Sequence, residues 1–132
     1  MRILVAGAAY FLIVFVAGIV LGMVRVGVLA PNLGATIAVL IELPVILVIS
    51  WYVCAAILRR VPLDSGLNED VLAGVLAFVL LIAAEALFAV GLGGRTLPEF
   101  FAHMVAADGL IGLLGQILFA AFPAIQTRRF VQ

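Results

Sequence analysis

Four long runs of apolar residues constrain this chain more than any other feature. A helix needs about 20 apolar residues to cross the hydrocarbon core of a bilayer. The four runs cover residues 3–24, 35–58, 70–91 and 107–125. Hydrophobic residues make up 67% of the chain and charged residues 11%, whereas about a quarter of a soluble domain is charged. We therefore expect one all-α transmembrane domain over residues 1–132, built as a bundle of four membrane-spanning helices.

The first two links between these spans are short. Residues 31–34, Pro-Asn-Leu-Gly, predict a turn after the first span. Residues 59–69 are the most polar stretch of the chain and predict a loop between the second and third spans. The first span is about twice as long as the apolar core of a signal peptide. We therefore expect it to remain in the protein as a helix.

The third link carries a helix signal of its own. Thr96 and Glu99 have the spacing of a capping box, and Pro98 lies in the first turn that this box would start. We therefore expect a short interfacial helix over residues 97–106, followed by a turn at Asp108 into the last span.

The arginines indicate how the spans are oriented. All seven basic residues are Arg, and they divide five to two between the two sides of the expected bundle. Cytoplasmic segments carry the excess of Lys and Arg. We therefore expect both termini in the cytoplasm, together with the loop over residues 59–69. The larger group is Arg2, Arg59, Arg60, Arg128 and Arg129, and the smaller group is Arg25 and Arg95.

Two carboxylates lie inside the expected spans. At about 1.5 Å per residue, Glu42 lies about 6 Å to the outer side of the middle of its span, and Glu85 lies at matching depth in the next one. Gln116 lies near the middle of the fourth span, and Arg25 lies near the outer end of the first. Ionisable residues in membrane spans are functional candidates. We therefore expect these four side chains to form an intramembrane polar cluster.

This cluster has three interpretations. In the first, Glu42 pairs with Arg25 or accepts a hydrogen bond, and the cluster only locks the helices together. In the second, it binds a proton, a cation or a polar head group, since two nearby carboxylates disfavour each other's ionised form. In the third, it meets another membrane subunit. We favour the first, in which the protein's own groups close the cluster.

Glycines mark the expected helix contacts. Gly18 and Gly22 form a GxxxG pattern in the first span, and Gly112 lies on the same face of the fourth span as Gln116. Small residues let membrane helices approach closely. We therefore expect these three glycines at helix–helix interfaces.

The sequence offers little for cofactor or metal chemistry. Cys54 is the only cysteine and His103 the only histidine, so two-histidine haem ligation and cysteine clusters are excluded within one chain. Ligation of one haem or chlorophyll by His103 is an alternative, but its position on the interfacial helix favours a solvated side chain. We find no catalytic motif, and expect no metal, no cofactor and no enzyme activity.

The run from Tyr10 to Val53, with the later segments AAEALF and GLLGQILFAAFP, resembles small, uncharacterised four-helix integral membrane proteins encoded in alphaproteobacterial genomes. The resemblance covers nearly the whole chain. It implies a bacterial inner membrane and carries no functional residues over.

Three functions remain open at this point. The first is a non-catalytic accessory or interaction subunit of a larger respiratory or photosynthetic membrane complex, favoured by the small size and the absence of reaction motifs. The alternative is a small transporter or a proton- or ion-handling protein that uses Glu42 and Glu85. The third is lipid or cofactor binding. The expected partners are the bilayer and other membrane subunits or further copies of this chain. A net charge of zero argues against nucleic acid.

Overall fold

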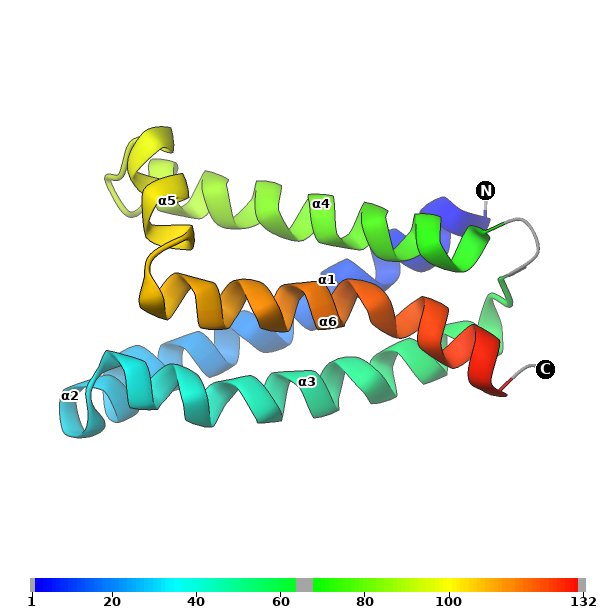
Figure 1. Cartoon of the computed structure of the whole chain (residues 1–132), viewed down its shortest axis with the longest axis horizontal. Helices are drawn as coiled ribbons and strands as arrows, with labels where there is room; N and C mark the ends of the chain where they lie inside the picture. Colours follow the sequence, from blue (N-terminus) through cyan, green and yellow to red (C-terminus); the bar gives the residue numbers. More distant parts are fainter. Residues whose placement is uncertain (1, 64–67, 131–132) are drawn as a thin grey trace.

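Four long helices lie side by side in the computed structural model, which describes residues 2–63 and 68–130 (Figure 1). They are α1 (Arg2–Val24), α3 (Ala35–Arg60), α4 (Glu69–Gly91) and α6 (Ala107–Phe130). Each contains a segment long and apolar enough to cross a membrane. The described ranges contain no β-strand. The expectation of an all-helical chain with four such helices is confirmed.

The first helical run is longer than the sequence pattern predicts. After α1 the chain continues through a π-helical turn, η1 (Arg25–Leu29), and a short helix, α2 (Ala30–Leu33). The turn expected over residues 31–34 is therefore largely helical, and the chain reverses at Gly34, whose φ is +89°. Pro31 lies in the first turn of α2, directly after the π-helical turn η1.

The link before the last span contains the expected helix. It is α5 (Leu97–Met104), two residues shorter than the expected range. The backbone N–H of Glu99 donates to the Thr96 hydroxyl, and the backbone N–H of Thr96 donates to the Glu99 carboxylate. The predicted capping box is thus confirmed. The loop expected over residues 59–69 lies partly outside the described residues, since these exclude 64–67.

Each long helix packs against two others. Helix α1 contacts α3 and α4, and α6 also contacts α3 and α4. Helices α1 and α6 are therefore diagonal to each other, and so are α3 and α4. Both chain ends lie at one end of the molecule, which we call the terminal end, and α2 and α5 lie at the other, which we call the α2/α5 end (Figure 1).

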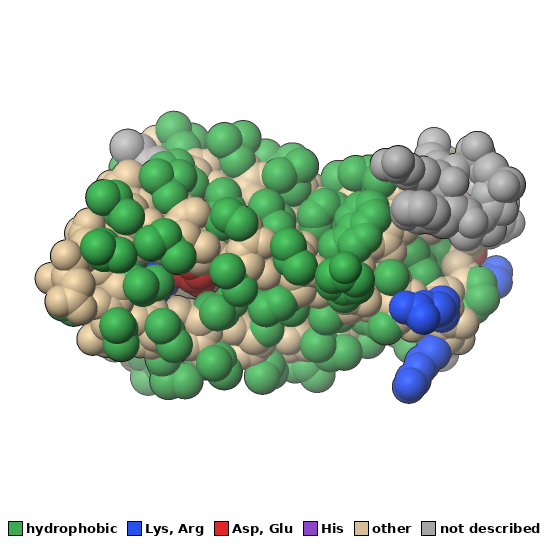
Figure 2. All heavy atoms as spheres, turned by 90° about the horizontal axis from the view of Figure 1, so that it is seen from below, with side chains coloured by type: hydrophobic (Ala, Val, Ile, Leu, Met, Phe, Trp, Pro, Cys, Tyr) green, Lys and Arg blue, Asp and Glu red, His purple; other side chains and the backbone are tan. Residues whose placement is uncertain are grey.

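Large apolar side chains are exposed on all four long helices, and many of them gather on the side shown in Figure 2. In the four apolar segments only 17–28% of the residues are buried. Water does not favour such a surface, and a hydrocarbon environment does. The exposed side chains include Leu12, Val16 and Val20 of α1, Val45 and Val48 of α3, Val75 and Val79 of α4, and Leu114 and Ile117 of α6.

A tyrosine crosses the centre of the structure and joins the diagonal pair α1 and α6. The Tyr10 ring is buried and stacks on Phe119, with 4.2 Å between ring centroids. Its hydroxyl donates to the backbone carbonyl of Phe119 at 2.7 Å. That carbonyl lacks its usual helical donor, because the residue four positions later is Pro123, which has no N–H. Tyr10 therefore satisfies an acceptor that Pro123 leaves unpaired.

We expect Tyr10→Phe to lower the free energy of unfolding in detergent by about 1 kcal/mol, since the Phe119 carbonyl then loses the hydroxyl that donates to it. In a Pro123→Ala background the same change costs less, because an N–H returns to that carbonyl. Tyr52→Phe is the matched control, since Tyr52 is 68% exposed. This interpretation is contradicted if Tyr10→Phe and Tyr52→Phe lower the free energy of unfolding equally. It is also contradicted if Tyr10→Phe costs as much in the Pro123→Ala background as in the wild type.

Candidate functional site: a cavity lined by a polar cluster

A cavity of about 490 Å³ lies between the four long helices, in the half nearer the α2/α5 end. Helix α5 also contributes to its wall. Figure 2 shows acidic side-chain atoms within a recess on an otherwise hydrophobic side of the molecule. Small-molecule sites in proteins have volumes of about 300–1,000 Å³. The polar residues that line this cavity are Arg25, Glu42, Ser50, Glu85, Arg95, His103 and Gln116.

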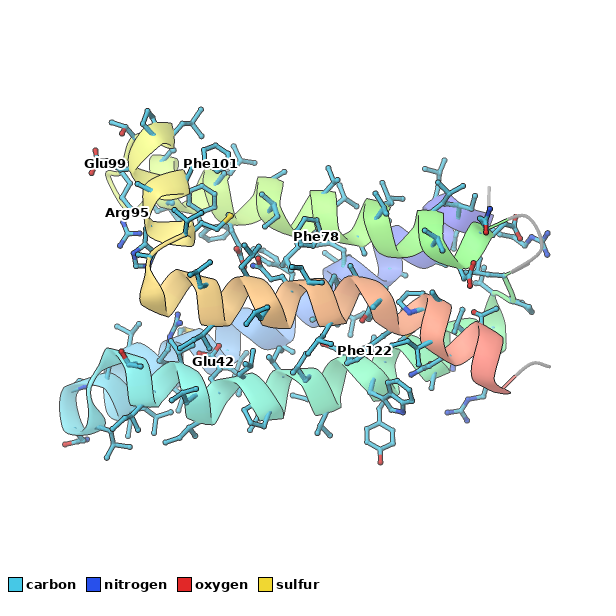
Figure 3. The ribbon with its side chains drawn as sticks, in the orientation of Figure 1. Glu42, Phe78, Arg95, Glu99, Phe101 and Phe122 are labelled. Carbon is cyan, nitrogen blue, oxygen red and sulfur yellow. The ribbon has the colours of Figure 1, made fainter. Side chains whose placement is uncertain are left out.

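Arg25 and Glu42 form an ion pair on the cavity wall. Arg25 is the first residue of the π-helical turn η1, and Glu42 lies in α3. The Nε atom of Arg25 lies 3.2 Å from Oε2 of Glu42, whose side chain is 16% exposed. That oxygen is buried and accepts no hydrogen bond from the described residues. The contact is therefore electrostatic and lacks an aligned hydrogen bond. Figure 3 shows Glu42 pointing from α3 into the space between the helices.

Glu85 and Gln116 form the second pair. Glu85 lies in α4 and Gln116 in α6, and the Gln116 amide donates to Oε2 of Glu85 at 2.6 Å. In the part of the chain that the structure describes, this neutral amide is the one hydrogen-bond partner of Glu85, and Glu85 makes no ion pair. Of the two carboxylates that line the cavity, Glu85 is therefore the one without an ion-pair partner among the described residues.

The two pairs lie within electrostatic range of each other. Glu85 interacts across the cavity with both Arg25 and Glu42. Glu42 and Glu85 were expected on neighbouring helices. In the structure α3 and α4 are diagonal, so the two carboxylates face each other across the cavity. The structure thus brings all four expected cluster residues to one site.

The structure contains the Arg25–Glu42 pair expected of a cluster closed by the protein's own groups, but a cavity also adjoins the cluster, and glycines line it. Gly18, Gly22 and Gly112 were expected at helix contacts, but all three line the cavity. A Cβ atom at Gly18 or Gly112 would meet nothing within 4 Å, and one at Gly22 would meet only the Arg25 guanidinium, 3.6 Å away. The missing side chains therefore leave the space in front of the cluster empty.

Other glycines make the close helix contacts instead. A Cβ atom at Gly74 of α4 would collide with the backbone carbonyl of Ala120 in α6. One at Gly7 of α1 would lie 3.0 Å from the carbonyl oxygen of Ala73 in α4. These positions bring α4 close to α6 and α1, which leaves the interior near the terminal end filled and the other half hollow.

His103 and Arg95 lie at the exposed edge of the cavity. Both side chains are exposed and both line it. In Figure 3 Arg95 lies beside α5, nearer to the α2/α5 end than Glu42 does. Met104 of α5 lines the cavity too. Over residues 2–63 and 68–130, no group of three or more His, Cys, Asp or Glu side chains is placed to hold a metal ion.

Sequence reasoning missed the aromatic part of this site. Phe15, Phe88, Phe100 and Phe119 come from four different helices and all line the cavity. Phe15 and Phe88 meet edge to face, with 5.6 Å between ring centroids. In a chain that is apolar on every helix face, the pattern does not separate a phenylalanine facing lipid from one facing a cavity.

Comparisons with protein-family models, with curated proteins and with solved structures found no match to this chain.

A double-mutant cycle measures the Arg25–Glu42 pair. We expect Arg25→Gln and Glu42→Gln to show a coupling free energy of about 0.5–3 kcal/mol in detergent, because each single change leaves a charge unpaired beside apolar walls. The control cycle uses Arg2 and Glu69 at the terminal end, 3.3 Å apart with Arg2 56% exposed. Exposed pairs contribute about 0.2–1 kcal/mol. A coupling at Arg25 and Glu42 no larger than this control refutes the pairing.

Proposed function

We propose that this chain is a multi-pass protein of a bacterial inner membrane, with four membrane-spanning helices and both termini in the cytoplasm, that takes a small molecule or ion into its cavity. The observation that carries the proposal is a cavity of ligand size with two carboxylates, two guanidinium groups and one amide on its wall. Binding or transport through this site follows from the second interpretation of the polar cluster.

The outer half of the membrane is the entry side in this proposal. Arg2, Arg59 and Arg60 lie toward the terminal end, and Arg25 and Arg95 lie toward the α2/α5 end. The side richer in arginine faces the cytoplasm. The cavity, with α5 at its edge, then lies in the extracytoplasmic half of the membrane.

A purely structural role fits the cavity less well. A cluster that only locks helices is most stable when its charges are paired, hydrogen-bonded and shielded by packed side chains. Here Glu42 Oε2 accepts no hydrogen bond from the described residues, and glycines hold the facing space empty. The accessory-subunit hypothesis stays a prediction, because the apolar exterior suits lipid and another subunit equally.

Purification in a mild detergent with native mass spectrometry tests this proposal. We expect the wild-type chain to retain a bound small molecule and Gly112→Leu to lose it, because the new side chain fills the cavity. Gly91→Leu is the control, since Gly91 lies outside the cavity and a Cβ there also meets nothing within 4 Å. A chain that carries no small molecule but co-elutes with the same membrane subunits in all three forms contradicts the proposal and supports the accessory subunit.

A further inference from the structure

The cavity wall carries two carboxylates, Glu42 and Glu85, and two guanidinium groups, Arg25 and Arg95, of which Arg95 lies at the exposed edge. Arg25 is already paired with Glu42. Among the described residues Glu85 has only the Gln116 amide. An ionised Glu85 therefore has no ion-pair partner among the described residues, in surroundings that screen charge poorly.

The shape and lining of the cavity restrict the cation that supplies this counter-charge. A volume of about 490 Å³ far exceeds that of a bare ion. The described residues also provide no cluster of three ligands for a metal. Most of the wall is apolar, with four phenylalanine rings among its residues. Aromatic rings stabilise organic cations through their faces and the apolar groups of a ligand through burial.

We propose that the cavity binds an organic ammonium ion with an apolar body, its nitrogen against Glu85 and its body among the phenylalanines. This inference rests on the proposed function, since it names the ligand class for the same cavity. Gln116 holds one carboxylate oxygen of Glu85 and leaves the other available to the ammonium group. The Arg25–Glu42 pair keeps the guanidinium occupied, which reduces its repulsion of the ligand.

Two kinds of molecule combine an ammonium group with an apolar body. One is a free lipophilic amine, and the other is a membrane lipid with an ethanolamine head group. The recess with acidic atoms lies on a hydrophobic side of the molecule (Figure 2). A ligand that dissolves in the bilayer reaches it from there, whichever source applies.

Three probes matched in size and different in charge test the ligand class: phenylbutylamine, phenylbutanol and phenylbutyrate. We expect the full chain in maltoside micelles to bind the amine about tenfold more tightly than the alcohol, from its charged contact with Glu85, and the carboxylate most weakly. We expect the Glu85→Gln variant to bind the amine no more tightly than the alcohol. Retained binding of the alcohol shows that its cavity is intact. Glu69→Gln, on the same helix but outside the cavity, is expected to bind like wild type.

The results separate this inference from the proposed function. Equal binding of the three probes, tighter binding of phenylbutyrate, or an unchanged amine preference in Glu85→Gln overturns the ligand class and leaves the cavity a binding site. Binding of none of the probes, in wild type as in Gly112→Leu, overturns both. Added phosphatidylethanolamine identifies the source: weaker amine binding assigns the site to the lipid head group, and unchanged binding assigns it to a free amine.

Discussion

The structure depends on one constraint: helices with apolar exteriors leave room for polar side chains only on their inner faces. Each unsatisfied polar group in hydrocarbon costs several kcal/mol. Arg25, Glu42, Glu85 and Gln116 accordingly turn inward from four different elements and meet around one cavity. The same constraint acts on the backbone. The carbonyl that Pro123 leaves without a donor receives the hydroxyl of Tyr10, a buried side chain from the diagonal helix.

Glycine has two opposite effects in this fold. At Gly74 the missing Cβ lets two helices come into backbone contact, and at Gly18 and Gly112 it leaves space that nothing fills. Gly74 lies toward the terminal end, and Gly18 and Gly112 lie toward the α2/α5 end. The cavity lies in the half of the molecule nearer the α2/α5 end. Glu85, the carboxylate without an ion pair among the described residues, lines it. This arrangement supports the binding role that we propose for the cavity.

Much of this fold follows from local pattern. Four apolar runs predict the long helices to within a few residues, and Thr96 with Glu99 predicts the cap of α5. The residues of the polar cluster stand out because ionisable groups are rare in such runs. The sequence does not predict that α3 and α4 are diagonal to each other. These helices are apolar on all sides, so no single apolar face indicates which helix packs against which. The sequence also does not predict the role of Gly18, because a GxxxG pattern looks the same whether the glycines lie at a helix contact or on a cavity wall.

The proposed function requires that the polar cluster opens onto an accessible cavity. A single cysteine at Gly112, in a chain whose buried Cys54 is replaced by alanine, tests it directly with a small cationic thiol reagent. Ala77→Cys in the same background is the control, because Ala77 is fully buried. The account predicts rapid labelling at position 112 and none at position 77 in the folded protein. A cysteine at position 112 as unreactive as the one at position 77 would contradict it.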